Sequence, residues 1–406
     1  MKQWLEKNWL WAAVDVAIVG LAVFVLVGVT TPQEIAGLFA PRPHRVDVEA
    51  LRAAAPSTTE EWEEALTASI AAGGDYLVRH QLSNGELPYE LYVVDGQDYV
   101  EPSGIRLVAG AGSLFTVCRV TGDQAYCRAG DAALARYFGH VVEREGMPGA
   151  CFYSEGMCRV GGSALAIDVV HKRWRATGDT TLDGTDLLDT ALQLGENLSW
   201  LRQDDGSLLH GFDPHTGLVN FTYHDRFFTG ESLMATLELY EMTGDPRWLE
   251  EARETNAYML RQEVTRDHWH AYSFWYLARL DDLTEADVGF ANDVGQAFGE
   301  VQMTWRSDLS AISAASMVEG SAALALALEA QGEPHEWLVP ELENFALYVM
   351  AHQLPDHPCQ WPETADFSGL EGGIISTCED PAIRIDGVQH WINGADTFLE
   401  YLRQTR

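Results

Sequence analysis

The sequence predicts an all-α protein built from repeated pairs of antiparallel helices. A Thr-Gly-Asp phrase recurs at 121–123, 177–179 and 243–245, and a degenerate Gln-Gly-Glu copy occupies 331–333. Each copy follows an apolar run with helical spacing and precedes a second such run, so the unit is helix, glycine turn, helix and a longer polar loop. One helix pair cannot bury its own apolar face, so this self-similarity indicates a repeat architecture.

Apolar spacing predicts about twelve helices in one large domain. They are expected at 58–82, 104–120, 124–145, 160–177, 183–203, 227–243, 246–263, 267–281, 284–302, 308–331, 335–353 and 385–404. The short glycine turns make consecutive helices antiparallel neighbours. The longer connections, 83–103, 146–159, 204–226 and 354–384, would then gather at the other end of a ring, where function is expected.

Residues 9–29 are nearly continuous apolar sequence, which is long enough to span a bilayer. Lys2 and Lys7 precede this segment and the next basic residues are distant, which favours a cytoplasmic N-terminus and an extracytoplasmic main domain. We therefore expect a single-pass protein of the cell membrane. Its expected parts are a cytoplasmic N-terminus at 1–8, a transmembrane signal-anchor at 9–29, a juxtamembrane linker at 30–55 and the helical domain at 56–406.

The six cysteines agree with an oxidising location outside the cytoplasm. They fall in three local pairs, Cys118 with Cys127, Cys151 with Cys158 and Cys359 with Cys378. Nearest-neighbour disulfides are the simplest expectation, although other connectivities remain open. Zinc binding is the weaker alternative, because no Cys-x-x-Cys sequence occurs.

The formal charge is −35, from 26 basic and 61 acidic residues. Such a field disfavours nucleic acid, whose phosphates need Lys and Arg for neutralisation. It also opposes a polyanionic substrate unless arginine is gathered locally. An acid-rich surface with few lysines suits a high-salt habitat, where screening relieves self-repulsion. An arginine-biased, acidic protein of ordinary habitat is the alternative.

Two phrases resemble the repeat of six-hairpin (α/α)6 proteins. One is Phe-Thr-Gly-Glu-Ser-Leu at 228–233, which continues to the Thr-Gly-Asp copy at 243–245 and to Trp248; the other is Gly-Gly-Ser-Ala-Leu-Ala at 161–166. That group includes six-hairpin glycosidases, unsaturated glucuronyl hydrolases and the N-acylglucosamine 2-epimerase group. The resemblance covers most of residues 58–404 and implies an (α/α)6 toroid of about six antiparallel helix hairpins. Because the phrase marks the scaffold, it assigns no catalytic residue.

Four residues are candidates for proton transfer or charge stabilisation: Glu231, Glu319, Asp386 and His390. Asp386 and His390 are spaced i,i+4 at the start of the last helix, where the carboxylate would make the imidazole a general base. Glu231 belongs to a first helical turn, where the helix dipole would stabilise its anion. Glu319 is a lone acid in an apolar helix and is expected to project into the bore.

The candidates for substrate positioning are polar and aromatic residues of the long connections, because tyrosine and tryptophan faces stack on sugar rings. They are Tyr89, Glu90, Arg106, Asp225, Trp269, Trp361 and Arg384. Ordinary turns, a buried tryptophan or a network closing the last helix onto the first are the structural alternatives. His210, His215 and His224 lie near Asp225, but their spacing matches no compact ligand pattern, so neither a metal nor a cofactor is expected.

These observations predict a membrane-anchored, extracytoplasmic carbohydrate-processing enzyme. It would be glycoside hydrolase-like, with acid and base groups acting on a saccharide or a cell-envelope glycan in the toroid mouth. A non-catalytic glycan-binding or assembly scaffold is one alternative, and a sugar epimerase or polysaccharide lyase on the same fold is another.

Overall fold

The computed structural model describes residues 48–405 except for 94–97, 100–103, 302–308 and 360–366. The predicted cytoplasmic N-terminus, the transmembrane segment at 9–29, most of the linker and Trp361 lie outside the described residues. The chain divides into two units, Met1–Pro43 and His44–Arg406, and the fold below is that of the second.

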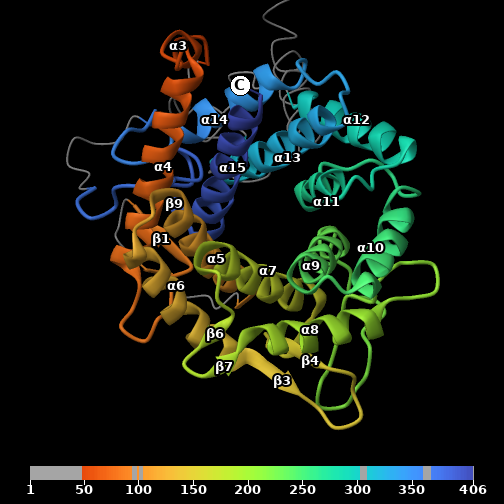
Figure 1. The fold of residues 1–406 in the computed structure, drawn as a ribbon. Helices are drawn as coiled ribbons and strands as arrows, with labels where there is room; N and C mark the ends of the chain where they lie inside the picture. Colours follow the sequence, from red (N-terminus) through yellow and green to blue (C-terminus); the bar gives the residue numbers. More distant parts are fainter. Residues whose placement is uncertain (1–47, 94–97, 100–103, 302–308, 360–366, 406) are drawn as a thin grey trace, which may run out of the picture. The chain divides into compact units, whose positions relative to one another are not determined.

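The second unit has an inner ring of helices. Its members are α5 (Gly104–Thr121), α7 (Val160–Thr177), α9 (Phe228–Thr243), α11 (His268–Arg279), α13 (Ala311–Ala330) and α15 (Ile385–Gln404). Each packs against the next, and α15 packs against α5, which closes the ring (Figure 1). The apolar residues of this ring are buried almost all round, as expected for helices covered on every side. The arrangement is the predicted (α/α)6 toroid.

An outer layer covers the inner ring. It consists of α4 (Thr59–His80), α6 (Gln124–Tyr137), α8 (Leu187–Leu201), α10 (Pro246–Met259), α12 (Glu285–Gly299) and α14 (Val339–Met350). α4 packs against α15, so the first hairpin is completed by the last helix of the chain. A short helix, α3 (Val48–Ala53), lies within the predicted linker and contacts α14.

The glycine of the recurring phrase ends one helix, and the residue after it can cap the next helix. Gly122, Gly178, Gly244 and Gly332 have φ values of 76°, 72°, 68° and 68°. These left-handed conformations suit glycine, which has no Cβ to clash. In two copies the aspartate then caps the outer helix, because the side chains of Asp123 and Asp245 accept backbone N–H groups of α6 and α10.

The long connections carry short strands. The strands β1 (Glu90–Tyr92), β2 (Asp98–Tyr99) and β9 (Ala382–Arg384) form one antiparallel sheet in the order β2-β1-β9. A second sheet has the order β3-β4-β5-β8, from β3 (Val141–Glu143), β4 (Ala150–Ser154), β5 (Met157–Arg159) and β8 (Gly211–Phe212). β6 (Thr181–Leu182) and β7 (Thr185–Asp186) form a hairpin.

The helix predicted at 124–145 is too long. α6 ends at Tyr137, and a 3-10 turn, η1 (Phe138–His140), leads into β3. Gly139 and the β-branched pair Val141 and Val142 are poor helix formers, and they outweigh the apolar spacing. The other predicted helices agree with the structure to within four residues at their described ends.

The three predicted disulfides are present. Cys118–Cys127 joins α5 to α6, Cys151–Cys158 joins β4 to β5, and Cys359–Cys378 closes part of the last long connection. Among the described residues, α13 has the length and apolar composition of a membrane span, but 83% of that window is buried inside the ring, as in a core helix.

A substitution of Gly372 would test how the last long connection packs against α4. Gly372 has φ 84°, and an added Cβ would lie 1.9 Å from the carbonyl oxygen of Ala72. Gly122 has a similar φ of 76° and nothing within 4 Å of such a Cβ, so it is a matched control. We expect Gly372→Ala to lower the free energy of unfolding by about 2 kcal/mol more than Gly122→Ala, measured by chemical denaturation. Equal losses would show that the contact does not constrain the fold.

Candidate functional site

The inner helices all begin at the same end of the ring, because outer helices and connections return the chain between them. A cavity of about 750 Å³, here called the rim cavity, lies at this end. The first turn of each inner helix, or the residue that precedes it, contributes to its lining: Arg106, Arg159, Glu231, His268, Ser313 and Asp386.

Seven of the predicted site residues line the rim cavity: Tyr89, Arg106, Asp225, Glu231, Trp269, Asp386 and His390. Glu319 lies directly behind His390, and Arg384 contacts Asp386. Glu90 pairs with Arg384 in the register of β1 and β9 but does not line the cavity. Side chains from connections that are far apart in the sequence therefore lie together at one end of the ring, as the predicted toroid implies.

His390 is held by a buried carboxylate. Its Nδ1 lies 2.6 Å from Glu319 Oε2, and Glu319 is fully buried on α13. Burial disfavours the charged ring, but the Glu319 carboxylate outweighs it and raises the pKa of His390. The partner predicted from i,i+4 spacing was Asp386, which is wrong: Asp386 instead pairs with arginines and acts on His390 only through its charge.

His268 faces His390 and was missed as a site residue. The two rings are 5.0 Å apart between centroids and nearly perpendicular, at 86°. His268 is 3% exposed, and its Nε2 makes no hydrogen bond within the described protein. Burial, followed by the charges of His390 and Arg226, lowers its pKa well below the ordinary value. The surroundings therefore set the pKa values of the two facing imidazoles apart.

A local signal for His268 existed in the sequence. It follows Asp267, whose side chain accepts the N–H groups of Trp269 and His270 and so caps α11. His268 thus occupies the first helical turn, as does Glu231 in α9, whereas His390 lies in the second turn of α15. A polar side chain in the first turn of an inner helix is the feature that His268 and Glu231 share.

Asp386 forms a rigid corner with two arginines and a tyrosine. Arg106 Nε lies 3.3 Å from Asp386 Oδ2, and Arg384 Nε lies 3.1 Å from Oδ1. Both guanidinium groups stand 5.6 Å from the centroid of the Tyr89 ring, and Arg106 also donates to the Tyr89 hydroxyl. Burial raises the pKa of Tyr89, which therefore stays neutral. Tyr89, Arg106 and Asp386 line one side of the cavity, and Arg384 holds Asp386 from outside the lining.

The surroundings of Glu231 disfavour the anion that the sequence predicted. Glu231 is 6% exposed, and burial, reinforced by the charges of Asp225, Asp267 and Asp168, raises its pKa well above the ordinary value. The helix dipole is too small to offset this desolvation. Its Oε2 makes no hydrogen bond within the described protein, and only a glycine fits beside it, because a Cβ on Gly161 would lie 2.3 Å away.

One group among the described residues has the spacing of a metal site. His268, Glu319 and His390 offer ligand atoms within 4.8 Å of one another. The short hydrogen bond between His390 and Glu319 already occupies one nitrogen and one oxygen, so we treat the group as an ion pair with a neighbouring imidazole. His210, near the predicted loop, instead accepts the Asp225 N–H and stacks on His224.

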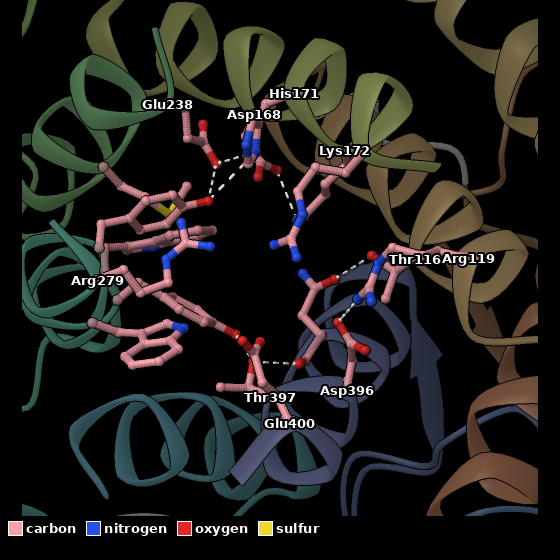
Figure 2. Close-up of a pocket in the computed structure, with 17 residues that line it drawn as sticks. Thr116, Arg119, Asp168, His171, Lys172, Glu238, Arg279, Asp396, Thr397 and Glu400 are labelled. Carbon is pink, nitrogen blue, oxygen red and sulfur yellow. Dashed lines mark hydrogen bonds and ion pairs between the residues drawn. The ribbon is translucent and has the colours of Figure 1, made fainter. Parts of the chain in front are cut away.

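A second, smaller cavity lies deeper in the bore, here called the bore cavity (Figure 2). It has a volume of about 70 Å³ and is lined by the later turns of inner helices. Its cations include Arg119, which pairs with Asp396, and Lys172, which pairs with Asp168 at 2.8 Å. Positive side chains near the C-terminal ends of these helices are favoured by the helix dipoles.

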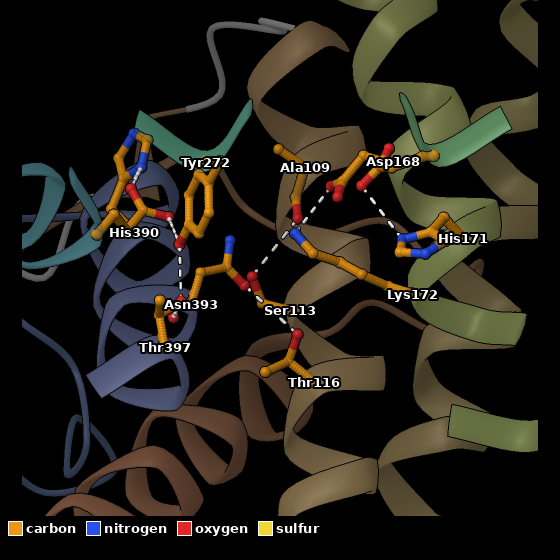
Figure 3. Close-up of polar contacts among 12 residues, drawn as sticks. Ala109, Ser113, Thr116, Asp168, His171, Lys172, Tyr272, His390, Asn393 and Thr397 are labelled. Carbon is orange, nitrogen blue, oxygen red and sulfur yellow. Dashed lines mark hydrogen bonds and ion pairs between the residues drawn. The ribbon is translucent and has the colours of Figure 1, made fainter. Parts of the chain in front are cut away.

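Glu319 connects the surroundings of the two cavities. Its hydrogen-bond partners His390 and Tyr272 are shown in Figure 3. Its Oε2 faces His390 of the rim cavity, while its Oε1 accepts the hydroxyl of Tyr272 at 3.3 Å. Tyr272 and its partner Thr397, 3.2 Å away, line the bore cavity. Both carboxylate oxygens are therefore engaged, which fixes the orientation of the carboxylate and of the imidazole that it holds.

Solved structures of carbohydrate-active proteins share this fold. The cellobiose 2-epimerase of Bacillus thermoamylovorans B4167 matches with a TM-score of 0.61 and 14% identity, over 85% of this chain and 99% of its own. A D-mannose isomerase matches with a TM-score of 0.63 and 11% identity, over 86% and 99%. An unsaturated glucuronyl hydrolase specific for heparin matches with a TM-score of 0.59 and 11% identity, over 83% and 98%.

No protein-family model matches the chain, and no curated protein is detectably similar to it in sequence. At such low identities the solved structures show the fold, so the predicted likeness to the six-hairpin (α/α)6 glycosidase-like group is confirmed at the level of the fold.

Glu319→Gln tests the ion pair. Without the carboxylate charge, the pKa of His390 falls, which an NMR titration of the imidazole measures. The folded pKa of His390 is raised, so its stabilising contribution is full below the ordinary histidine pKa of about 6.5 and is lost as pH rises through the folded value. That pH dependence of the unfolding free energy should shrink in the variant. Glu333→Gln, in the exposed turn after α13, is the control and should leave the titration of His390 unchanged.

Proposed function

We propose that this chain is a carbohydrate-processing enzyme that moves protons at a sugar carbon in the rim cavity. One observation carries this proposal. Two imidazoles face each other in a cavity of saccharide size, one with a lowered and one with a raised pKa. Near neutral pH, His268 is therefore a base and His390 an acid, which is the pairing that general acid–base catalysis needs.

The chemistry that this pair suits is epimerisation or isomerisation beside a sugar carbonyl. The imidazole of His268 would take the proton from the carbon beside the carbonyl, and the C–H electrons would form a C=C bond. The C=O π bond would open as the carbonyl oxygen takes a proton from His390, which gives an enediol. One enediol hydroxyl would then give up its proton as a carbonyl re-forms: a proton returned to the opposite face of the first carbon gives the epimer, and a proton added to the former carbonyl carbon gives the isomer. Glu319 holds the Nδ1 side of His390, which leaves its other nitrogen for the substrate.

Glycoside hydrolysis, the leading expectation from the sequence, is the second candidate. Glu231 lines the cavity and its pKa is raised by burial, and Asp386 lines it as well, paired with Arg106 and Arg384. Such a pair has the roles of proton donor and base in a glycosidase. A binding scaffold is less well supported, because it has no need for unpartnered buried acids and imidazoles in its cavity.

We further propose a membrane-anchored, extracytoplasmic protein that meets a saccharide or cell-envelope glycan. The apolar run at 9–29 and the lysines before it support the anchor. The three disulfides support an oxidising compartment. The net charge of −35 supports a high-salt habitat and argues against a nucleic-acid partner.

Replacing either imidazole should stop proton transfer. We expect His268→Asn and His390→Asn each to lower turnover by about 10²–10⁴-fold. Reducing sugars incubated in D₂O and followed by NMR would show deuterium at the carbon beside the carbonyl with the wild type only. His215→Asn, at an exposed position that does not line the cavity, is the control. Wild-type turnover should fall as pH rises through the raised pKa of His390 and as it drops through the lowered pKa of His268.

A different result of these experiments would distinguish hydrolysis from epimerisation. Release of new reducing ends from glycosides without deuterium at carbon, abolished by Glu231→Gln and retained in His268→Asn, would favour hydrolysis over epimerisation.

A further inference from the structure

We propose that the saccharide taken by the rim cavity carries a carboxylate, as a uronate does, and that Arg226 binds this group. The inference rests on the proposed function, whose substrate it narrows. It names a specificity-determining residue that the sequence did not single out.

Among the arginines that line the rim cavity, Arg226 is the one without a hydrogen-bond or ion-pair partner in the described part of the chain. Three arginines line the cavity, and two of them are paired: Arg106 with Asp386, and Arg159 with Glu155 at 2.7 Å. The Arg226 guanidinium makes no hydrogen bond or ion pair with the described part of the chain, and it lies 4.3 Å from the centroid of the Phe227 ring. Stacking occupies one face of the guanidinium and leaves its N–H edge for a planar, bidentate anion.

Two buried donors of the rim cavity have no partner among the described residues. Gln389 is 2% exposed and lines the cavity, and its Nε2 makes no hydrogen bond there. Arg159 Nε is equally unpartnered. Buried donors without acceptors are costly, so the ligand that completes this site is rich in acceptors.

The carboxylates of the cavity do not cancel this preference. Glu155 and Asp386 are each paired with arginine, and burial raises the pKa of Glu231, which disfavours its charged form. Asp225 accepts the backbone N–H of Phe227 through its Oδ1. The first turns of the inner helices also face the cavity, and their dipoles add positive potential there.

Arg226 is also close to the reacting groups. It lines the same cavity as His268 and His390, and its charge is among the causes that lower the pKa of His268. A carboxylate bound at Arg226 would therefore place a sugar ring beside the two imidazoles.

The test compares two probes and three proteins. The probes are a glucose disaccharide and the same disaccharide with its non-reducing C6 oxidised to a carboxylate. The proteins are the wild type, Arg226→Gln and, as a control of equal charge change on the exposed segment before α11, Arg266→Gln. Binding is measured by calorimetry and turnover by NMR in D₂O.

We expect the wild type and Arg266→Gln to bind the acidic disaccharide at least about tenfold more tightly than the neutral one, and Arg226→Gln to lose this preference while binding the neutral disaccharide unchanged. The preference should shrink with added salt. Equal binding of both probes by the wild type, or equal weakening of both in Arg226→Gln, would overturn the inference and leave the proposed function standing. Binding of neither probe would instead count against the proposed function itself.

Discussion

The site depends on one carboxylate buried in an otherwise apolar helix. Glu319 is fully buried on α13, where an unpartnered charge would be very costly. Its partners come from both neighbouring inner helices, Tyr272 from α11 and His390 from α15. The carboxylate is therefore satisfied only when these three helices are packed side by side in the closed ring. The ring makes the ion pair possible, and the ion pair fixes the imidazole that faces the cavity.

The common direction of the inner helices divides the bore electrostatically. At their N-terminal ends the rim cavity gathers an acid and an imidazole whose charged forms are disfavoured by burial, Glu231 and His268, together with arginines that are largely paired. At later turns the bore cavity gathers cations with acidic partners, such as Lys172 with Asp168. At the rim, the positive potential of the helix N-termini therefore adds to the charge of the arginines. Deeper in the bore, the negative potential of the helix C-termini is offset by the cations. An acceptor-rich ligand suits the rim.

Most of the scaffold could be predicted from the sequence because its signals are local. A glycine that ends one helix and an aspartate that caps the next act within a few residues, as at Gly244 and Asp245. The site was harder, because Glu319 and His390 are 71 residues apart and spacing instead suggested Asp386. The protonation of Glu231 was mispredicted for a related reason: the dipole is visible in a sequence, but the depth of burial is not.

The two imidazoles differ because they share one counter-charge. Glu319 Oε2 lies 2.6 Å from His390 Nδ1 and 3.6 Å from His268 Nε2, so one ring is hydrogen bonded and the other is not. A second proton would place two cations in rings only 5.0 Å apart with a single carboxylate between them. The pair therefore titrates as a coupled unit, in which the charged form is favoured on His390 and disfavoured on His268. A symmetric pair would offer two bases or two acids, whereas this geometry favours the proton on one ring over the other.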